Sequence, residues 1–282
     1  MKNRLKLLRR GLYNIIPFYK KISVIIDITR NIDKRSQELK KEVNLLRKSI
    51  DPYSLGEISK KVLGEFKIGD NILTNNGTIF FKDSKDRFVP AHEALLKFTD
   101  KCTADHLVLD LGCGKDQVHS DIMRSCGVNV KTCDLDKNSD FSGFYEEIEF
   151  KEKFDAIWCS HTLEHVLNPH GFLVKIRNDI KEGGILSITV PPLKHNIVGG
   201  HVNLFNAGLL LYRMILAGFD CSNCEIKKYG YNISIIMEVK TIQDDLPQDL
   251  SYDIGDIEKL QKYFPFEAKQ SFYGDFDIIN WK

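Results

Sequence analysis

Short apolar runs of strand length alternate with helix-length segments from residue 104 onward. The runs at 107–111, 128–134, 154–160 and 183–192 read as buried strands. Segments with helical signals separate them, so the pattern predicts a parallel sheet with helices on both faces. Predicted helices include 91–103 before the first strand, 168–181 with Pro169 near its first turn, and 204–218. Two later runs, 225–228 and 233–240, predict an antiparallel hairpin that closes the sheet.

The chain before residue 91 has a different pattern. Residues 1–29 carry apolar positions at near-helical spacing among cations, and residues 32–50 continue as a charged helix that ends before Asp51-Pro52. Turn residues at 75–77 precede the run 78–81, which together with 88–90 predicts a β-hairpin or lid. We therefore expect a basic helical arm at 1–50, a linker or lid at 51–90 and the α/β domain at 91–242. We expect an acidic, aromatic segment at 243–282 that packs over the site or on a neighbour.

Charge is distributed unevenly along the chain. Residues 1–50 hold 14 Lys and Arg against 4 acids, whereas residues 241–282 hold 4 Lys against 9 acids. The middle is slightly acidic, which argues against a nucleic-acid-binding groove. For the arm 1–50, three roles stay open: a homodimer contact, an anionic membrane surface, or a cap on its own domain. Its cations interrupt any apolar core, so it does not resemble a secretory signal.

Composition indicates a globular chain of 282 residues with 43% hydrophobic residues and seven cysteines. An odd number of cysteines in predicted strands and helices favours reduced thiols and a cytoplasmic location, with membrane association as the alternative. Cys221 and Cys224 form a lone C-x-x-C. A zinc site needs two further ligands at matching spacing, so we expect buried thiols there.

Candidate chemistry begins at the strand end Asp110-Leu111-Gly112-Cys113-Gly114. Glycines without Cβ atoms let a ligand approach the backbone, and the N-terminus of the next helix offers unpaired N–H groups. Asp134 ends the second strand about 20 residues later, where a carboxylate can bind a ribose diol. A loop without a ligand could also use these glycines. The third glycine of a nicotinamide fingerprint is missing, because the chain continues Lys115-Asp116-Gln117.

With these motifs and the strand-to-helix junction at 160–165, the chain resembles the class I S-adenosylmethionine-dependent methyltransferases over roughly residues 90–240. The resemblance implies a Rossmann-like, mostly parallel seven-stranded sheet with an antiparallel C-terminal hairpin, and S-adenosylmethionine as cofactor. It also implies an acid near the adenine amine, for which Asp140 and Glu146 are only loosely placed. The cofactor-binding residues it implies are Asp110, Gly112, Cys113, Gly114, Asp134, Leu135, Ser160 and His161.

Three histidines are candidates for proton transfer. In a helix, His161, Glu164 and His165 would share one face by their i, i+3, i+4 spacing, next to the expected methyl group. His201 arrives from the loop after the fifth strand and is our preferred base. We expect no metal, although the segment resembles the metal-binding Glu-x-x-Glu-His of some quinone O-methyltransferases with His161 in place of the first Glu. A third alternative is that Glu164 and His165 only cap or pack the helix.

The resemblance and the charge distribution together suggest a methyltransferase that acts on an oxygen of a small-molecule or cell-surface polysaccharide acceptor, a sugar or sugar phosphate. Two alternatives remain. One is a non-catalytic cofactor-binding subunit of a biosynthetic assembly, and the other is a metal-assisted quinone-type O-methyltransferase.

Overall fold

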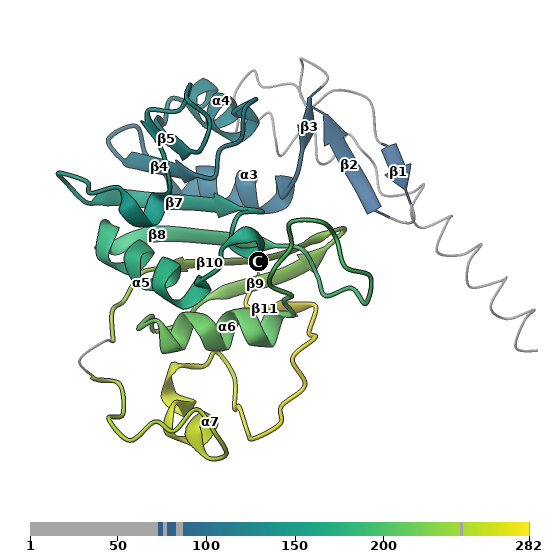
Figure 1. The fold of residues 1–282 in the computed structure, drawn as a ribbon, viewed down its shortest axis with the longest axis vertical. Helices are drawn as coiled ribbons and strands as arrows, with labels where there is room; N and C mark the ends of the chain where they lie inside the picture. The colour runs from purple at the N-terminus through teal and green to yellow at the C-terminus, as the bar shows by residue number, and fades with distance from the viewer. Residues whose placement is uncertain (1–72, 76–77, 83–86, 243–244, 282) are drawn as a thin grey trace, which may run out of the picture. The chain divides into compact units, whose positions relative to one another are not determined.

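The computed structural model describes the backbone of residues 73–75 and 78–82 and the whole of residues 87–242 and 245–281 (Figure 1). All of them belong to one compact unit, Gly56–Lys282. The predictions for the arm 1–50 lie outside the described residues.

An eight-stranded sheet forms the centre of this unit, in the order β11-β9-β10-β8-β7-β4-β5-β6 (Figure 1). Strands β4 to β8 pair in parallel, and β9, β10 and β11 pair antiparallel. The predicted fold class is confirmed, with β11 as an eighth strand. The strands are β4 (Leu107–Leu111), β5 (Asn129–Asp134), β6 (Phe141–Ser142), β7 (Phe154–Ser160), β8 (Ile180–Val190), β9 (Glu225–Tyr229), β10 (Asn232–Glu238) and β11 (Ile278–Ile279).

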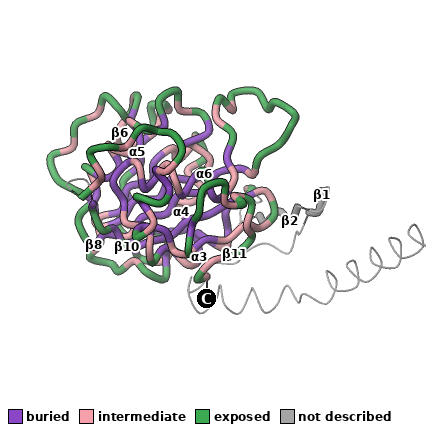
Figure 2. The backbone as a smooth tube through the Cα atoms, turned by 90° about the horizontal axis from the view of Figure 1, so that it is seen from below, coloured by how far each residue is buried: buried purple, intermediate pink, exposed green. Residues whose placement is uncertain are grey.

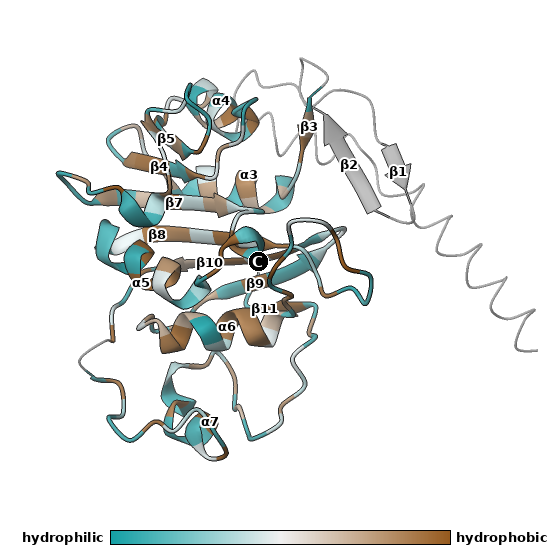
Figure 3. Ribbon diagram, in the orientation of Figure 1, coloured by the Kyte–Doolittle hydropathy of each residue, from teal (hydrophilic) through white to brown (hydrophobic). Residues whose placement is uncertain are grey.

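Burial explains why these runs form the interior of the sheet. Consecutive residues of a strand point to opposite faces, and β4 and β7 are buried at nearly every position, so both faces are covered. Figure 2 shows the buried backbone concentrated in the middle of the molecule, and Figure 3 shows the apolar colouring of the same strands. The longer helices around the sheet are α3 (His92–Lys101), α4 (Val118–Ser125), α5 (Pro169–Asp179) and α6 (Ala207–Leu216).

The boundary between the helix predicted over 168–181 and the strand after it moves. The helix predicted over 168–181 ends at Asp179, because Ile180 pairs with Phe154 and starts β8 three residues before the predicted strand. Asn168 caps the helix, accepting a hydrogen bond from Gly171 N at 3.0 Å. Between β5 and β7, no full helix forms in the described chain. The two-residue β6 and the single turn η1 (Tyr145–Glu147) stand there instead.

Before the large sheet, β1 (Leu73–Asn75), β2 (Thr78–Lys82) and β3 (Phe88–Val89) form a three-stranded antiparallel sheet. β2 and β3 pair as a hairpin of 78–81 with 88–90 requires, and β1 adds a third strand on β2. The role of this hairpin as a lid stays a prediction.

The C-terminal segment packs against α6 and the sheet edge, and the expectation that it covers the site or a neighbour stays a prediction. Gly208 N donates to Gly274 O at 2.8 Å, and Phe264 stacks on Tyr212 of α6. The aromatic residues, with α7 (Asp256–Lys259) and η4 (Gln261–Tyr263), bury one another, and β11 pairs with β9. Cys221 and Cys224 are buried free thiols, as expected.

Among the residues that the structure describes, none of the helices combines the length and the apolar composition that a membrane-spanning helix requires.

One buried histidine makes the stability of the fold depend on pH. His119 of α4 accepts a hydrogen bond from Trp158 Nε1 at 3.0 Å on Nδ1, and its Nε2–H donates to Pro90 O at 2.9 Å. Burial lowers the pKa of His119 from 6.5 to about 4. The unfolded chain therefore binds more protons between these values, and the stability that the neutral ring contributes is lost as pH falls from about 6.5 to about 4.

We expect His119→Gln, which cannot take up this proton, to lose less unfolding free energy than the parent chain between pH 7 and pH 4. Urea unfolding at a series of pH values measures both profiles. Parallel profiles would show that His119 does not contribute this dependence.

Candidate functional site

The glycine loop lies between β4 and α4, at the carboxyl end of the central strand. Gly112 and Gly114 have φ of +76° and +67°, a region that residues with a Cβ rarely adopt. A Cβ on Gly112 would lie 1.9 Å from Thr162 Oγ1, whereas no atom of the described residues would lie within 4 Å of one on Gly114. The loop therefore packs closely against the end of β7 on one side and leaves open space beside its backbone on the other.

Asp110 lies near the end of β4, just before this loop. Its carboxylate is buried and accepts a hydrogen bond of 2.5 Å from Ser120 Oγ, which ties β4 to the first turn of α4. Burial raises the pKa of Asp110 to about 7. The carboxylate therefore fixes the start of α4 relative to β4 on the two sides of the glycine loop.

Cys113 is half-buried, and burial with the nearby Asp110 and Asp134 carboxylates raises the pKa of its thiol to about 12. It is therefore a neutral thiol at pH 7. Any contribution to a bound anion would come from its backbone.

Asp134 ends β5 beside the glycines, as predicted. Its Oδ2 accepts from Gly114 N and its Oδ1 from Asp136 N, both at 2.9 Å. Each carboxylate oxygen keeps a second lone pair, so the group can still accept from ligand hydroxyls. Asp140, one loose candidate for the adenine amine, instead binds Thr132 N and Thr132 Oγ1, at 2.9 Å each.

Two exposed apolar residues belong to the two segments that meet at this strand end. Leu135 is 63% exposed and Phe144 is 60% exposed, and the bond from Gly143 N to Asp134 O holds their segments together. A flat aromatic group between them would cover apolar surface that otherwise faces water. Sequence reasoning included Leu135 and missed Phe144, whose segment has no motif.

We expect Asp134→Ala to weaken S-adenosylhomocysteine binding by about 1.5–3 kcal/mol, the range for a hydrogen bond to a charged group. Isothermal titration calorimetry measures the change. Because Asp134 also holds Gly114 N, the matched variant Asp134→Asn, whose amide oxygen can still accept one bond, should lose less. Unchanged affinity in Asp134→Ala would remove this residue from the site.

The turn after β7 brings His161 and Glu164 together, but not on an α-helix. Residues Leu163–His165 form a single 3-10 turn, and His161 precedes it with a left-handed φ of +53°. The predicted shared helical face was therefore wrong in geometry, although the pair does meet: His161 Nδ1 lies 3.4 Å from Glu164 Oε1. Backbone strain of this kind is frequent at functional sites.

Asn232 fixes the tautomer of His161. Its Nδ2 donates to Tyr229 O at 3.2 Å and its Oδ1 accepts from Ala91 N at 3.2 Å, so the amide orientation is determined. The His161 Nε2, 2.9 Å from that Oδ1, must therefore carry the proton and donate. No sequence signal pointed to Asn232, because it lies 71 residues from His161 and reaches it only through the sheet.

Glu164, the acid of this turn, is buried, with a side chain that is 1% exposed. Its Oε2 has no hydrogen-bond partner among the described residues. Its backbone oxygen accepts from Val202 N at 2.9 Å and Asn203 N at 3.1 Å, which fixes the loop after β8 against the turn after β7.

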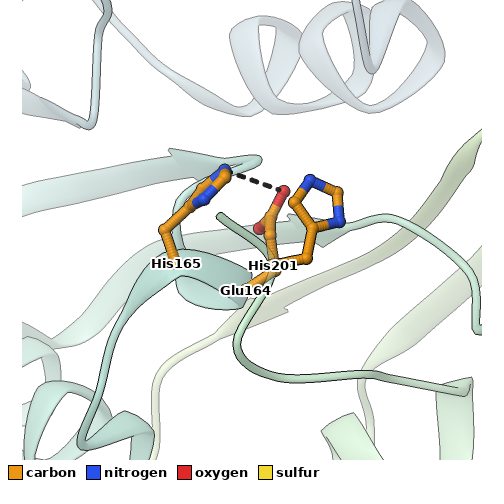
Figure 4. A group of neighbouring side chains, drawn as sticks. All are labelled: Glu164, His165 and His201. Atoms are coloured by element: carbon orange, nitrogen blue, oxygen red, sulfur yellow. Dashed lines mark ion pairs between the residues drawn. The ribbon is translucent and has the colours of Figure 1, made fainter. Parts of the chain in front are cut away.

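This contact places His201 beside His165. Their rings lie 4.9 Å apart and nearly perpendicular, and one ligand atom from each of Glu164, His165 and His201 lies within 4.8 Å of the others (Figure 4). The two histidines come from different loops, so the structure brings together two of the three histidines that the sequence suggested for proton transfer. Ser160, predicted to contact the cofactor, is 8% exposed and its hydroxyl lacks a partner within the described chain.

Part of the chain is similar to known methyltransferases. Residues 84–221 match the family described as "Methyltransferase domain". A ubiquinone biosynthesis O-methyltransferase of Glaesserella parasuis is 31% identical over 104 residues, which is 29% of this chain and 44% of that protein, so the match spans less than half of the relative's length.

Solved structures of similar shape include two S-adenosylmethionine-dependent methyltransferases. The one from Archaeoglobus fulgidus is 14% identical, with a TM-score of 0.42, over 52% of this chain and 90% of its own. The one from Aquifex aeolicus is 17% identical, with a TM-score of 0.42, over 52% of this chain and 88% of its own.

Residues 84–221 are thus similar to a methyltransferase domain, and S-adenosylmethionine is the cofactor to test against the site. The residues present fit the cofactor. Gly114 leaves open space beside the backbone, Asp134 can accept from ribose hydroxyls, and the unpartnered Ser160 hydroxyl lies at the end of β7. When bound, the cofactor supplies an electrophilic methyl group.

Proposed function

We propose that the chain transfers a methyl group from S-adenosylmethionine to an oxygen of a small-molecule or cell-surface saccharide acceptor. The observation that carries this proposal is the meeting of His201 with the Glu164-His165 turn, one loop beyond the glycine loop. An acceptor hydroxyl held there would lie next to an imidazole that can take its proton. Proton removal contributes typically about 10²–10⁴-fold, and alignment of acceptor and methyl supplies the rest.

The saccharide class rests on the absence of a basic groove in the sequence of the central domain and on the polar groups of the turn. It fits a cytoplasmic enzyme of polysaccharide biosynthesis. The test is turnover with methyl-labelled cofactor and a panel of sugars, sugar phosphates and sugar nucleotides. Cofactor binding without turnover on any acceptor would favour a non-catalytic subunit instead.

A second candidate, a metal-assisted O-methyltransferase of the quinone type, is favoured by one observation. His165 Nδ1 lies 2.8 Å from Gly200 O and must donate to it, since a carbonyl only accepts. In the neutral ring the Nε2 lone pair then faces Glu164 Oε1 at 3.8 Å. Two electron-pair donors face each other favourably only with a proton or a cation between them, and metal-bound histidines commonly donate their other N–H to a carbonyl.

With His201, this arrangement offers two imidazoles and one carboxylate. Such a nitrogen-rich set suits zinc or iron better than magnesium, which prefers oxygen ligands. Activity lost in chelator and restored by a divalent cation would select this candidate. Activity that survives chelator would select metal-free transfer.

A further inference from the structure

The rim of the site is unusually apolar. Six large aliphatic side chains are exposed on the two loops that carry His165 and His201, with Leu167 at 88%, Ile197 at 77% and Val202 at 56%. The other three are Leu193, Val198 and Leu204. Single exposed apolar residues are common on protein surfaces, but a group of them on adjacent loops marks a surface that contacts something apolar.

Hydrogen bonds hold the end of the loop 193–204 beside the segment that carries Leu167. Asn203 Nδ2 donates to Val166 O at 2.6 Å, next to Leu167, and the bonds from Val202 N and Asn203 N to Glu164 O tie the same two loops. The loop between β8 and α6 projects from the body of the molecule, is exposed over most of its length, and carries apolar colouring (Figures 1, 2 and 3). The apolar side chains therefore stand out from the surface around the site.

Charge identifies the partner. The sequence has no Asp or Glu from residue 183 to residue 219, and within this stretch Lys194 lies on the projecting loop among the apolar residues. Lys194 Nζ lies 4.0 Å from the centroid of the Tyr231 ring, so the cation is at the same rim. Aliphatic side chains with a cation and without acids are the composition of a surface that enters the headgroup region of an anionic bilayer.

We propose that Leu167 and the loop 193–204 form an apolar rim that inserts into the surface of an anionic lipid bilayer and admits an acceptor carried by a lipid. The acceptor part rests on the proposed function. The bilayer contact does not, because it depends only on the exposed side chains.

The test is co-flotation of the full chain with vesicles of equimolar phosphatidylcholine and phosphatidylglycerol, in about 1 M salt, where the Debye length of about 3 Å screens any contribution from the basic residues 1–50. Three serine substitutions, Leu167→Ser, Ile197→Ser and Val202→Ser, remove apolar side chains from the rim. The control carries Tyr252→Ser, Ile254→Ser and Tyr273→Ser, at positions that are 78–79% exposed elsewhere.

We expect the rim variant to partition at least about 100-fold less than the parent, since each buried CH₂ contributes to membrane affinity, and the control to partition like the parent. The proposal is overturned if rim and parent partition alike, if the control loses as much as the rim variant, or if the parent binds no vesicles in high salt. It is also overturned if light scattering shows that the rim substitutions only dissociate a dimer.

A shift in melting temperature with S-adenosylhomocysteine, measured on the same proteins, reports cofactor binding separately, so failure of the lipid contact and failure of the proposed function are distinguishable.

Discussion

Gly112→Val is expected to abolish the rise in melting temperature that S-adenosylhomocysteine causes. At a ligand concentration of 100 times Kd, binding stabilises the native chain by about 2.7 kcal/mol, or roughly 5–10 °C in a domain of this size. A valine Cβ would overlap Thr162 Oγ1 at 1.9 Å, and the φ of +76° disfavours a β-branched residue. The loop must therefore move, and the backbone that faces the ligand moves with it.

Loss of binding must be separated from loss of the fold. Gly127 has a comparable φ of +84°, and no atom of the described residues lies within 4 Å of its Cβ position. Gly127→Val thus carries the same backbone strain without the overlap, and it lies after α4, away from the glycine loop. The control should be less stable than the parent but keep its ligand-induced shift. A full shift in Gly112→Val would remove the loop from the cofactor site.

His201→Ala should lower kcat by about 10²–10⁴-fold, the usual contribution of a general base. Its affinity for S-adenosylhomocysteine should stay nearly intact, because the loop 193–204 is separate from the glycine loop and Asp134, which we expect to bind the cofactor. The measurement is single-turnover methyl transfer, with cofactor affinity from calorimetry on the same samples. His195→Ala is the matched control, since His195 is an exposed histidine of the same loop.

Three outcomes separate the mechanisms at this turn. A kcat lowered only in His201→Ala, with no effect of chelator, supports base catalysis. A loss in chelator that a divalent cation restores supports Glu164, His165 and His201 as ligands. Full activity of His201→Ala and His165→Ala without metal would mean that alignment alone drives the transfer.

Local sequence patterns were sufficient for the sheet and the glycine loop. An unbroken apolar run such as 107–111 has few alternatives to a buried strand, and the glycines after it lie at positive φ as expected. The eighth strand could not be foreseen. Ile278–Ile279 is only two residues long, and its pairing with β9 depends on how the preceding aromatic residues pack on α6.

The candidate site was predictable where neighbours in sequence are neighbours in space. Asp134 and the glycines obey a fixed strand–turn–helix spacing, whereas Asn232 reaches His161 through the register of β10. A new helix begins at Pro169, with Asn168 as its cap, just after the turn 163–165. The segment from His161 to that cap is therefore too short for an α-helix, and it forms a 3-10 turn instead. The meeting of His165 with His201 depends on the path of the loop after β8, which no local pattern determines.

A crystal structure of the full chain with S-adenosylhomocysteine tests the central claim most directly. We expect the ribose hydroxyls on Asp134, the amino acid part beside Gly112 and Gly114, and the sulfur directed toward the Glu164, His165 and His201 cluster. A ligand bound away from the glycine loop, or a sulfur that faces away from His201, would contradict the account.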